Sequence, residues 1–143
     1  MTKELQTSPV TLRQAHAALL EDLRKLEEVA RAHTEKNSLD LQVCLQATHA
    51  HISAHFRFEE QDGYFEAVRK RAPQQARAIQ QLAAEHRELA QALNGLLQES
   101  RAASAAEPFR QKITEWVQWV RAHEARENKL VQEVFNRDFE AED

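Results

Sequence analysis

Apolar residues recur at alternating spacings of three and four in four consecutive segments, and this period constrains the fold more than any other feature. Each such stripe fits one face of an α-helix. Three of the segments open at Pro9, Pro73 and Pro108, and proline is favourable at a first helical position because its missing N–H costs nothing there. The fourth opens at Asn37 and Ser38, two residue types that cap helix N-termini. The sequence therefore predicts helices over roughly residues 9–34, 38–70, 73–100 and 108–137.

The connections between these segments are short, which is typical of helices that pack antiparallel to their chain neighbours. A chain of 143 residues is also long enough to bury one substantial core. We therefore predict an all-α, up-down-up-down four-helix bundle that forms a single domain over residues 1–143. Gly63 and Gly95 fall inside the second and third predicted helices, and either could mark a kink or an earlier end.

Composition excludes several classes of function. The formal net charge is −4 and no basic stripe stands out, which argues against a nucleic-acid partner. No apolar run reaches the length of a membrane span, and the first ten residues lack the apolar core of a signal peptide. Cys44 is the only cysteine, so no disulfide can form within the chain. A cytoplasmic protein with no membrane partner is the default expectation.

Each predicted helix carries a histidine in its apolar stripe, and the second and fourth carry a glutamate four residues later. A buried carboxylate without a partner is very costly, so these groups should be hydrogen-bonded, paired or bound to metal. Residues four apart share a helix face, with Cβ atoms about 5–6 Å apart, so each His-Glu pair can point toward one place. The six candidate metal ligands are His16, His55, Glu59, His86, His123 and Glu127.

The helical rise tests whether these side chains lie level in the bundle. On the predicted boundaries, His86 and the two His-Glu pairs lie about thirteen residues, or roughly 20 Å, from the same end. His16 lies only about seven residues from that end, a mismatch of roughly 9 Å. A tilted or overhanging first helix would remove the mismatch.

Four imidazoles and two carboxylates suit iron, zinc, copper or manganese better than calcium or magnesium, which prefer oxygen ligands alone. Six side chains are too many for one tetrahedral zinc ion. Two metals bridged by Glu59 and Glu127 would each have two imidazoles and two carboxylate oxygens. Such a centre would keep open positions for an external ligand.

The pattern resembles the hemerythrin-like, or HHE cation-binding, family. The resemblance rests on His16 in HAALLEDL, His86 in EHRELA, and the His-Glu pairs in HFRFEEQ and HEARENKL, one set per helix in the family's order. It implies a hemerythrin-like bundle and two iron ions with an oxo or hydroxo bridge, for which zinc or manganese could substitute. It also implies a small diatomic or peroxide ligand. Members of the family serve as oxygen carriers, sensors, iron-handling modules or peroxide-consuming enzymes.

The sequence departs from the oxygen carriers of that family at two places. Leu82 stands where the carriers have a second histidine, one turn before the third-helix ligand. The fourth-helix carboxylate is Glu127, four residues after His123, where the carriers have an aspartate five residues after; here that position is Asn128. Losing one imidazole should leave one iron more open, which favours redox turnover or sensing over reversible oxygen carriage.

Three functions therefore remain open: a non-heme di-iron protein that binds or reduces dioxygen, peroxide or nitric oxide, an iron- or oxygen-sensing module that acts through a protein partner, and an oxygen store or carrier. A zinc-stabilised or metal-free interaction bundle is the remaining alternative. His51, one turn before His55, and Tyr64 are further candidates for the site. Phe58 and Trp119 lie off the apolar stripes, so the chain could be a monomer or a homodimer.

Overall fold

The computed structural model describes residues 9–32, 38–61, 64–102 and 107–142, and all its regular structure is helical within these ranges. Helix propensity is high throughout because glycine and proline are scarce and alanine, leucine, glutamate, glutamine and arginine are frequent. The elements, in chain order, are α2 (Pro9–Arg31), α3 (Ser38–Gln61), α4 (Tyr64–Arg71), the 3₁₀ turn η2 (Pro73–Gln75), α5 (Ala76–Ala102) and α6 (Glu107–Glu142).

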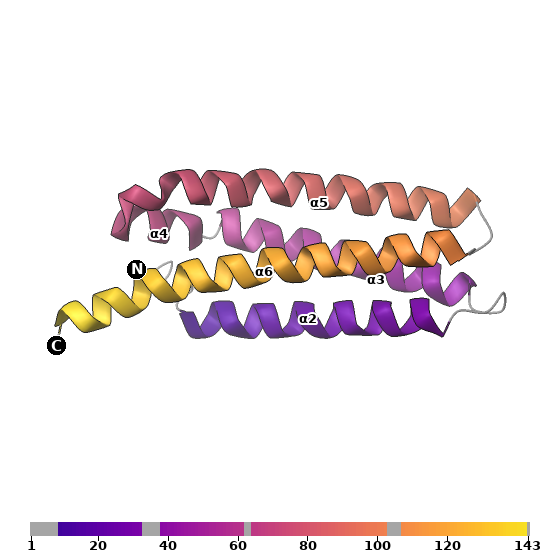
Figure 1. The fold of residues 1–143 in the computed structure, drawn as a ribbon, viewed down its shortest axis with the longest axis horizontal. Coiled ribbons are helices and arrows are strands. Elements are labelled where there is room, and N and C mark those ends of the chain that lie inside the picture. The colour runs from indigo at the N-terminus through magenta and orange to yellow at the C-terminus, as the bar shows by residue number, and fades with distance from the viewer. Residues whose placement is uncertain (1–8, 33–37, 62–63, 103–106, 143) are drawn as a thin grey trace.

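The four long helices form the antiparallel bundle that the sequence predicts (Figure 1). Helix α2 packs against α3 and α6, and α5 packs against the same two helices, so α2 and α5 lie on one diagonal of the bundle. The short helix α4 packs against the beginning of α5 and, with the C-terminal part of α6, projects beyond the start of α2 (Figure 1). None of the described helices is long and apolar enough to cross a membrane.

The prediction of one continuous helix over residues 38–70 is wrong. The structure has two separate helices there, α3 ending at Gln61 and α4 beginning at Tyr64, and Gly63 lies outside the described residues. Asn94 and Gly95, by contrast, lie within the continuous helix α5.

The interruption also accounts for the height mismatch expected at His16. The bundle ends are not flush, because α3 ends well before residue 70 and α4 and α6 project past α2 (Figure 1). Distances along each helix from a common end were therefore the wrong measure. His16 lies level with Glu59, with 3.1 Å between its Nε2 and a carboxylate oxygen of that residue.

The core is divided into two apolar clusters by a layer of buried polar side chains. The larger cluster holds residues of α2, α3, α5 and α6 from Leu19 and Leu23 to Val117 and Val120. The smaller one is built around α4 and the ends of α5 and α6 that lie beside it, with Val68, Ile79 and Val134 among its members. The layer contains the side chains His16, His55, Glu59, His86, His123, Glu124 and Glu127, each no more than 8% exposed. Apolar packing on both sides of this layer restricts access of water to it.

Candidate metal centre

All six predicted ligand residues meet in the polar layer, together with a seventh, Glu124. Their donor atoms fall into two groups, and within each group the atoms lie within 4.8 Å of one another. The first group combines His16 and His55 with three glutamates, Glu59, Glu124 and Glu127. The second group combines His86 and His123 with Glu127. Every long helix contributes at least one of these side chains.

The two carboxylate oxygens of Glu59 face different histidines. Oε2 lies 3.1 Å from Nε2 of His16 and 3.3 Å from Nε2 of His55. Oε1 lies 3.2 Å from Nε2 of His86. Glu59 therefore spans the space between the two groups.

The two carboxylate oxygens of Glu127 also face different histidines. Its Oε2 lies 3.3 Å from Nε2 of His16, whereas its Oε1 lies 2.7 Å from Nε2 of both His86 and His123. In each of the two carboxylates, one oxygen faces the first histidine pair and the other oxygen faces the second pair. This is the arrangement expected of side chains that bridge two cations. The bridging role predicted for both residues stays a prediction, and the divided oxygens are compatible with it.

Glu124 was not among the predicted ligands. Its Oε2 lies 2.8 Å from Nε2 of His16 and its Oε1 lies 3.3 Å from Nε2 of His55, so it adds a third carboxylate to the first group. The search for residues four apart missed it because it directly follows His123 and lies about 100° around the helix from it. A heptad register would have found it, since Val117 and Val131 lie seven residues on either side and both are buried.

Several donor atoms in this layer have no hydrogen-bond partner among the described residues, although charged neighbours surround them. They include Nε2 of His55, Oε1 of Glu59, both carboxylate oxygens of Glu124 and Oε2 of Glu127. Buried polar atoms without partners are uncommon in folded proteins. Atoms that share one metal ion lie about 3.0–3.4 Å apart when each is bonded at about 2.1 Å. The contacts of Glu59 with three histidines, at 3.1–3.3 Å, fall in this range, whereas the 2.7–2.8 Å contacts of Glu124 and Glu127 are also hydrogen-bond distances. The residues present therefore fit a metal centre.

The electrostatics also fit a site for cations. Burial opposes protonation of His16, but the surrounding carboxylates, that of Glu124 first, raise the pKa of its imidazole to about 11. The same balance raises the pKa of His55 to about 9 and that of His86 to about 10. Burial raises the pKa of Glu59, but its contacts with the imidazoles of His16, His55 and His86 hold it well below its usual value. The carboxylates thus attract positive charge, which protons or metal ions can supply.

Carboxylates outside the layer orient the second histidine pair. Nδ1 of His86 donates to Oε2 of Glu60 at 2.6 Å, and Nδ1 of His123 donates to Oε1 of Glu85 at 2.6 Å. A hydrogen bond at Nδ1 leaves Nε2 to face the centre, which is how metal-binding histidines are commonly fixed. Glu85 is itself held by the indole N–H of Trp119 at 3.0 Å and by Arg126 at 2.6 Å.

Aromatic rings further fix the orientation of His86. Phe56 stacks on its imidazole with 3.9 Å between ring centroids and 9° between planes. Phe65 also stacks on His86, at 5.5 Å and 21°. This ligand is therefore held by packing as well as by Glu60, and the sequence alone indicated neither contact.

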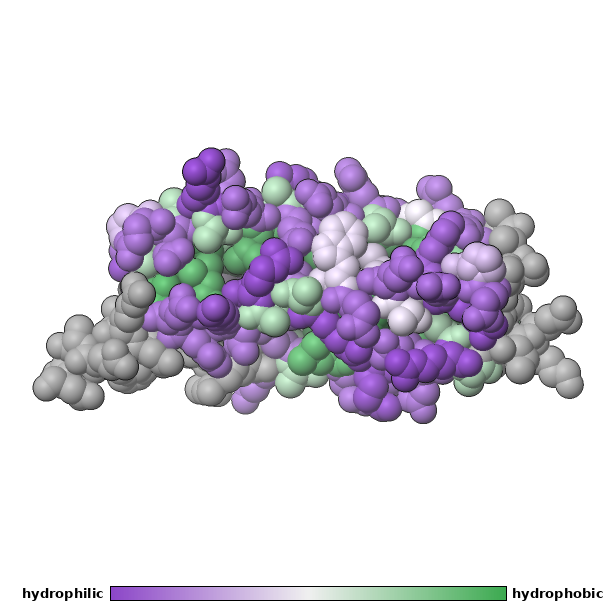
Figure 2. Space-filling model, in the orientation of Figure 1, coloured by the Kyte–Doolittle hydropathy of each residue, from purple (hydrophilic) through white to green (hydrophobic). Residues whose placement is uncertain are grey.

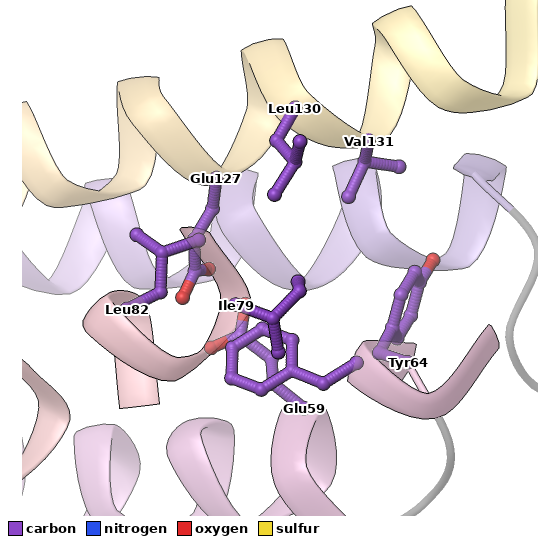
Figure 3. A pocket seen from close by; sticks show the side chains of 8 residues that line it. Glu59, Tyr64, Ile79, Leu82, Glu127, Leu130 and Val131 are labelled. Atoms are coloured by element: carbon purple, nitrogen blue, oxygen red, sulfur yellow. The ribbon is translucent and has the colours of Figure 1, made fainter. Parts of the chain in front are cut away.

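The remaining candidates lie outside the two donor groups. His51 is exposed and pairs with Asp22, with 2.9 Å between Nδ1 and the carboxylate. Tyr64 lines a cavity beside Glu59 and Glu127, and its hydroxyl points toward α6 rather than toward the carboxylates (Figure 3). Phe58 and Trp119 are partly buried against the core, so neither stands out as a surface for a second copy.

Comparison with protein families finds one match over most of the chain. The model of the hemerythrin HHE cation binding domain matches residues 8–135, a range that contains every side chain of the polar layer. Comparison with curated proteins and with solved structures finds no significant match.

Proposed function

The chain belongs to the hemerythrin HHE cation-binding domain family, and on that premise we propose that it is a di-iron protein that binds and reduces dioxygen, peroxide or nitric oxide. The observation that carries this proposal is the division of the oxygens of Glu59 and Glu127 between the two histidine pairs. Each carboxylate can serve two cations at once, and a single ion would leave one histidine pair without a metal.

The donor types are compatible with iron. Imidazole and carboxylate together suit iron, zinc and manganese, and zinc or manganese could substitute for iron in this set. When bound, two ferrous ions would supply the two electrons that convert one hydrogen peroxide and two protons into two waters. The protein's part is to hold the ions close together in a layer that apolar clusters protect from bulk water.

The third carboxylate, Glu124, favours turnover over reversible oxygen carriage. An additional anionic ligand stabilises the more highly charged oxidation state of a metal, because the attraction between opposite charges grows with the charge of the ion. A carrier must return to the ferrous state each time it releases oxygen. Glu124 beside His16 and His55 works against that return.

A sensing role is the second candidate, and the distribution of the ligands supports it. The seven side chains come from α2, α3, α5 and α6, so metal binding links all four long helices. Binding free energy at such a site becomes folding free energy, and occupancy would change the stability of the whole bundle. A partner protein could then distinguish the loaded from the unloaded form.

The ligand assignment is tested by mutation and metal analysis. His55→Ala and Glu59→Ala should each remove most of the bound iron, whereas His49→Ala, on the same helix but outside both donor groups, should not. Equal losses from all three variants, or none from any, would show that the ligands are misassigned.

Turnover and sensing are separated by titration of the reduced, iron-loaded protein with dioxygen, hydrogen peroxide or nitric oxide. The proposal predicts oxidant consumption in proportion to iron, and its loss in Glu59→Ala. A large rise in melting temperature on metal loading, without any consumption, would instead favour the sensing role. Reversible oxygenation over many cycles would contradict both.

A further inference from the structure

The two donor groups supply unequal numbers of protein ligands. The group around His16 and His55 has three carboxylates within reach. The group around His86 and His123 has Glu127, and Glu59 through one oxygen at 3.2 Å from His86. On α5, the residue one turn before His86 is Leu82, which has no donor atom. An external ligand would therefore find its free position on the His86–His123 side.

A small cavity lies next to the centre; no described histidine lines it, but Phe65, which stacks on His86, does and connects it to this side. The carboxylates of Glu59 and Glu127 form one wall, and Figure 3 shows both pointing toward the space between α3, α5 and α6. The remaining lining is apolar or aromatic: Tyr64, Phe65, Ile79, Leu82, Leu130 and Val131. The cavity has a volume of about 10 Å³, which is close to the space that a single water-sized molecule needs. Its size and lining suit an uncharged diatomic molecule better than a hydrated anion.

The cavity adjoins a groove on the surface between α5 and α6. This groove has a volume of about 250 Å³ and includes Leu82 and Leu130 in its lining, so the same two side chains separate it from the cavity. Leu82 is 6% exposed and Leu130 is 8% exposed, so both are buried with only a small part of each side chain open to the groove. Figure 2 shows apolar surface in the hollow between α5 and α6, toward the end where α4 lies.

We propose that dioxygen and nitric oxide enter between Leu82 and Leu130 and bind on the His86–His123 side of the centre. The inference rests on the di-iron function proposed above. Admission of a diatomic molecule needs only a rotamer change of these two leucines, which line both the cavity and the groove. Glu124 fills the position on the opposite side, against His16 and His55.

A second groove provides the competing route. It lies between α2 and α3, has a volume of about 500 Å³ and reaches the metal ligand His55. Its rim carries the ion pair of His51 and Asp22. Ala54 is exposed in its lining, so Ala54→Leu would narrow this groove at little cost to folding.

The test measures how fast nitric oxide binds to the reduced, iron-loaded protein by stopped-flow absorption. Leu82→Ala and Leu130→Ala, made separately on two helices, should each raise the bimolecular rate constant severalfold because they widen the passage. The control is Leu93→Ala, which removes a fully buried leucine from α5 in the other apolar cluster. That variant and Ala54→Leu should bind nitric oxide at the wild-type rate.

A second readout uses dissolved dioxygen and needs no iron. Dioxygen is paramagnetic and broadens NMR signals of nearby methyl groups. In the zinc-loaded protein, which is diamagnetic, it should broaden the methyl signals of Leu82, Leu130 and Val131 far more than those of Leu23 and Leu93.

Metal content, measured first on every sample, separates this inference from the function beneath it. Two iron ions per chain, with equal rates in the wild type and both leucine variants, would overturn the route alone. A lower rate in Ala54→Leu, or dioxygen broadening confined to the α2–α3 groove, would assign the route to that groove instead. A wild-type protein that binds no metal would overturn both proposals.

Discussion

The metal-free protein should lose stability steeply as the pH rises above neutral, whereas the metal-loaded protein should not. Folding raises the pKa of His55 to about 9, of His86 to about 10 and of His16 to about 11, from 6.5 in the unfolded chain. A raised pKa contributes stability that is fully present below 6.5 and disappears as the pH rises through the folded value. The loss therefore falls in the window from pH 6.5 to about 11.

The size of the effect follows from the number of imidazoles that remain protonated. Each imidazole that keeps its proton only in the folded state lowers the free energy of unfolding by about 1.4 kcal/mol per pH unit. Two such groups would remove about 3 kcal/mol per unit, and a domain of this size has only about 5–15 kcal/mol in total. The lowered pKa of Glu59 does not offset this, because its contribution is constant above the normal carboxylate range and is lost only in acid.

Urea unfolding at a series of pH values, with chelator-treated and zinc-loaded protein side by side, measures this slope. In the loaded form Nε2 binds metal rather than a proton, so the midpoint should stay level or rise with pH. His86→Gln should make the slope of the metal-free protein shallower, and His51→Gln, outside the centre, should leave it unchanged. A metal-free wild type that is equally stable at pH 6.5 and 9 would refute the reasoning, because its buried imidazoles would then be neutral.

Three further predictions follow from single side chains. Glu124→Gln should weaken metal binding on the His16–His55 side, so that one ion dissociates at chelator concentrations that leave the wild type loaded. The control Glu115→Gln, on the exposed face of α6, should have no effect on metal binding. Glu85→Gln removes the carboxylate that orients His123 and should lower metal affinity by about 10–100-fold in a competition assay, with the exposed Glu88→Gln as control. Gly95→Ala should raise the free energy of unfolding by about 0.5–1 kcal/mol, because the added methyl meets open space within a helix; an unchanged or lower urea midpoint would contradict this.

The fold was predictable because the signals for it are local. Apolar spacing identifies the buried face of each helix, and prolines identify where three of the helices begin. The one helix prediction that failed was that over residues 38–70, where the structure has two helices, α3 and α4. The interruption matters for the site, since it creates α4, which brings Tyr64 and Phe65 against the centre.

The candidate site was predictable where its side chains follow the helical repeat. His55 with Glu59, and His123 with Glu127, are spaced by one turn, so the sequence places each pair on one face. Glu124 lies on a neighbouring stripe and becomes part of the centre only through the way α6 packs against α2 and α3. The carboxylates that orient the histidines are harder still to predict from the sequence. The contact of Glu60 with His86, for example, joins two helices and depends on the relative height of α3 and α5.

The most direct test of the central claim is the iron content of the purified full-length protein, measured by elemental analysis after expression with ample iron. The proposed centre, with Glu59 and Glu127 shared between two histidine pairs, predicts two iron ions per chain. A single ion per chain, whether iron or zinc, or no bound metal at all, would contradict it.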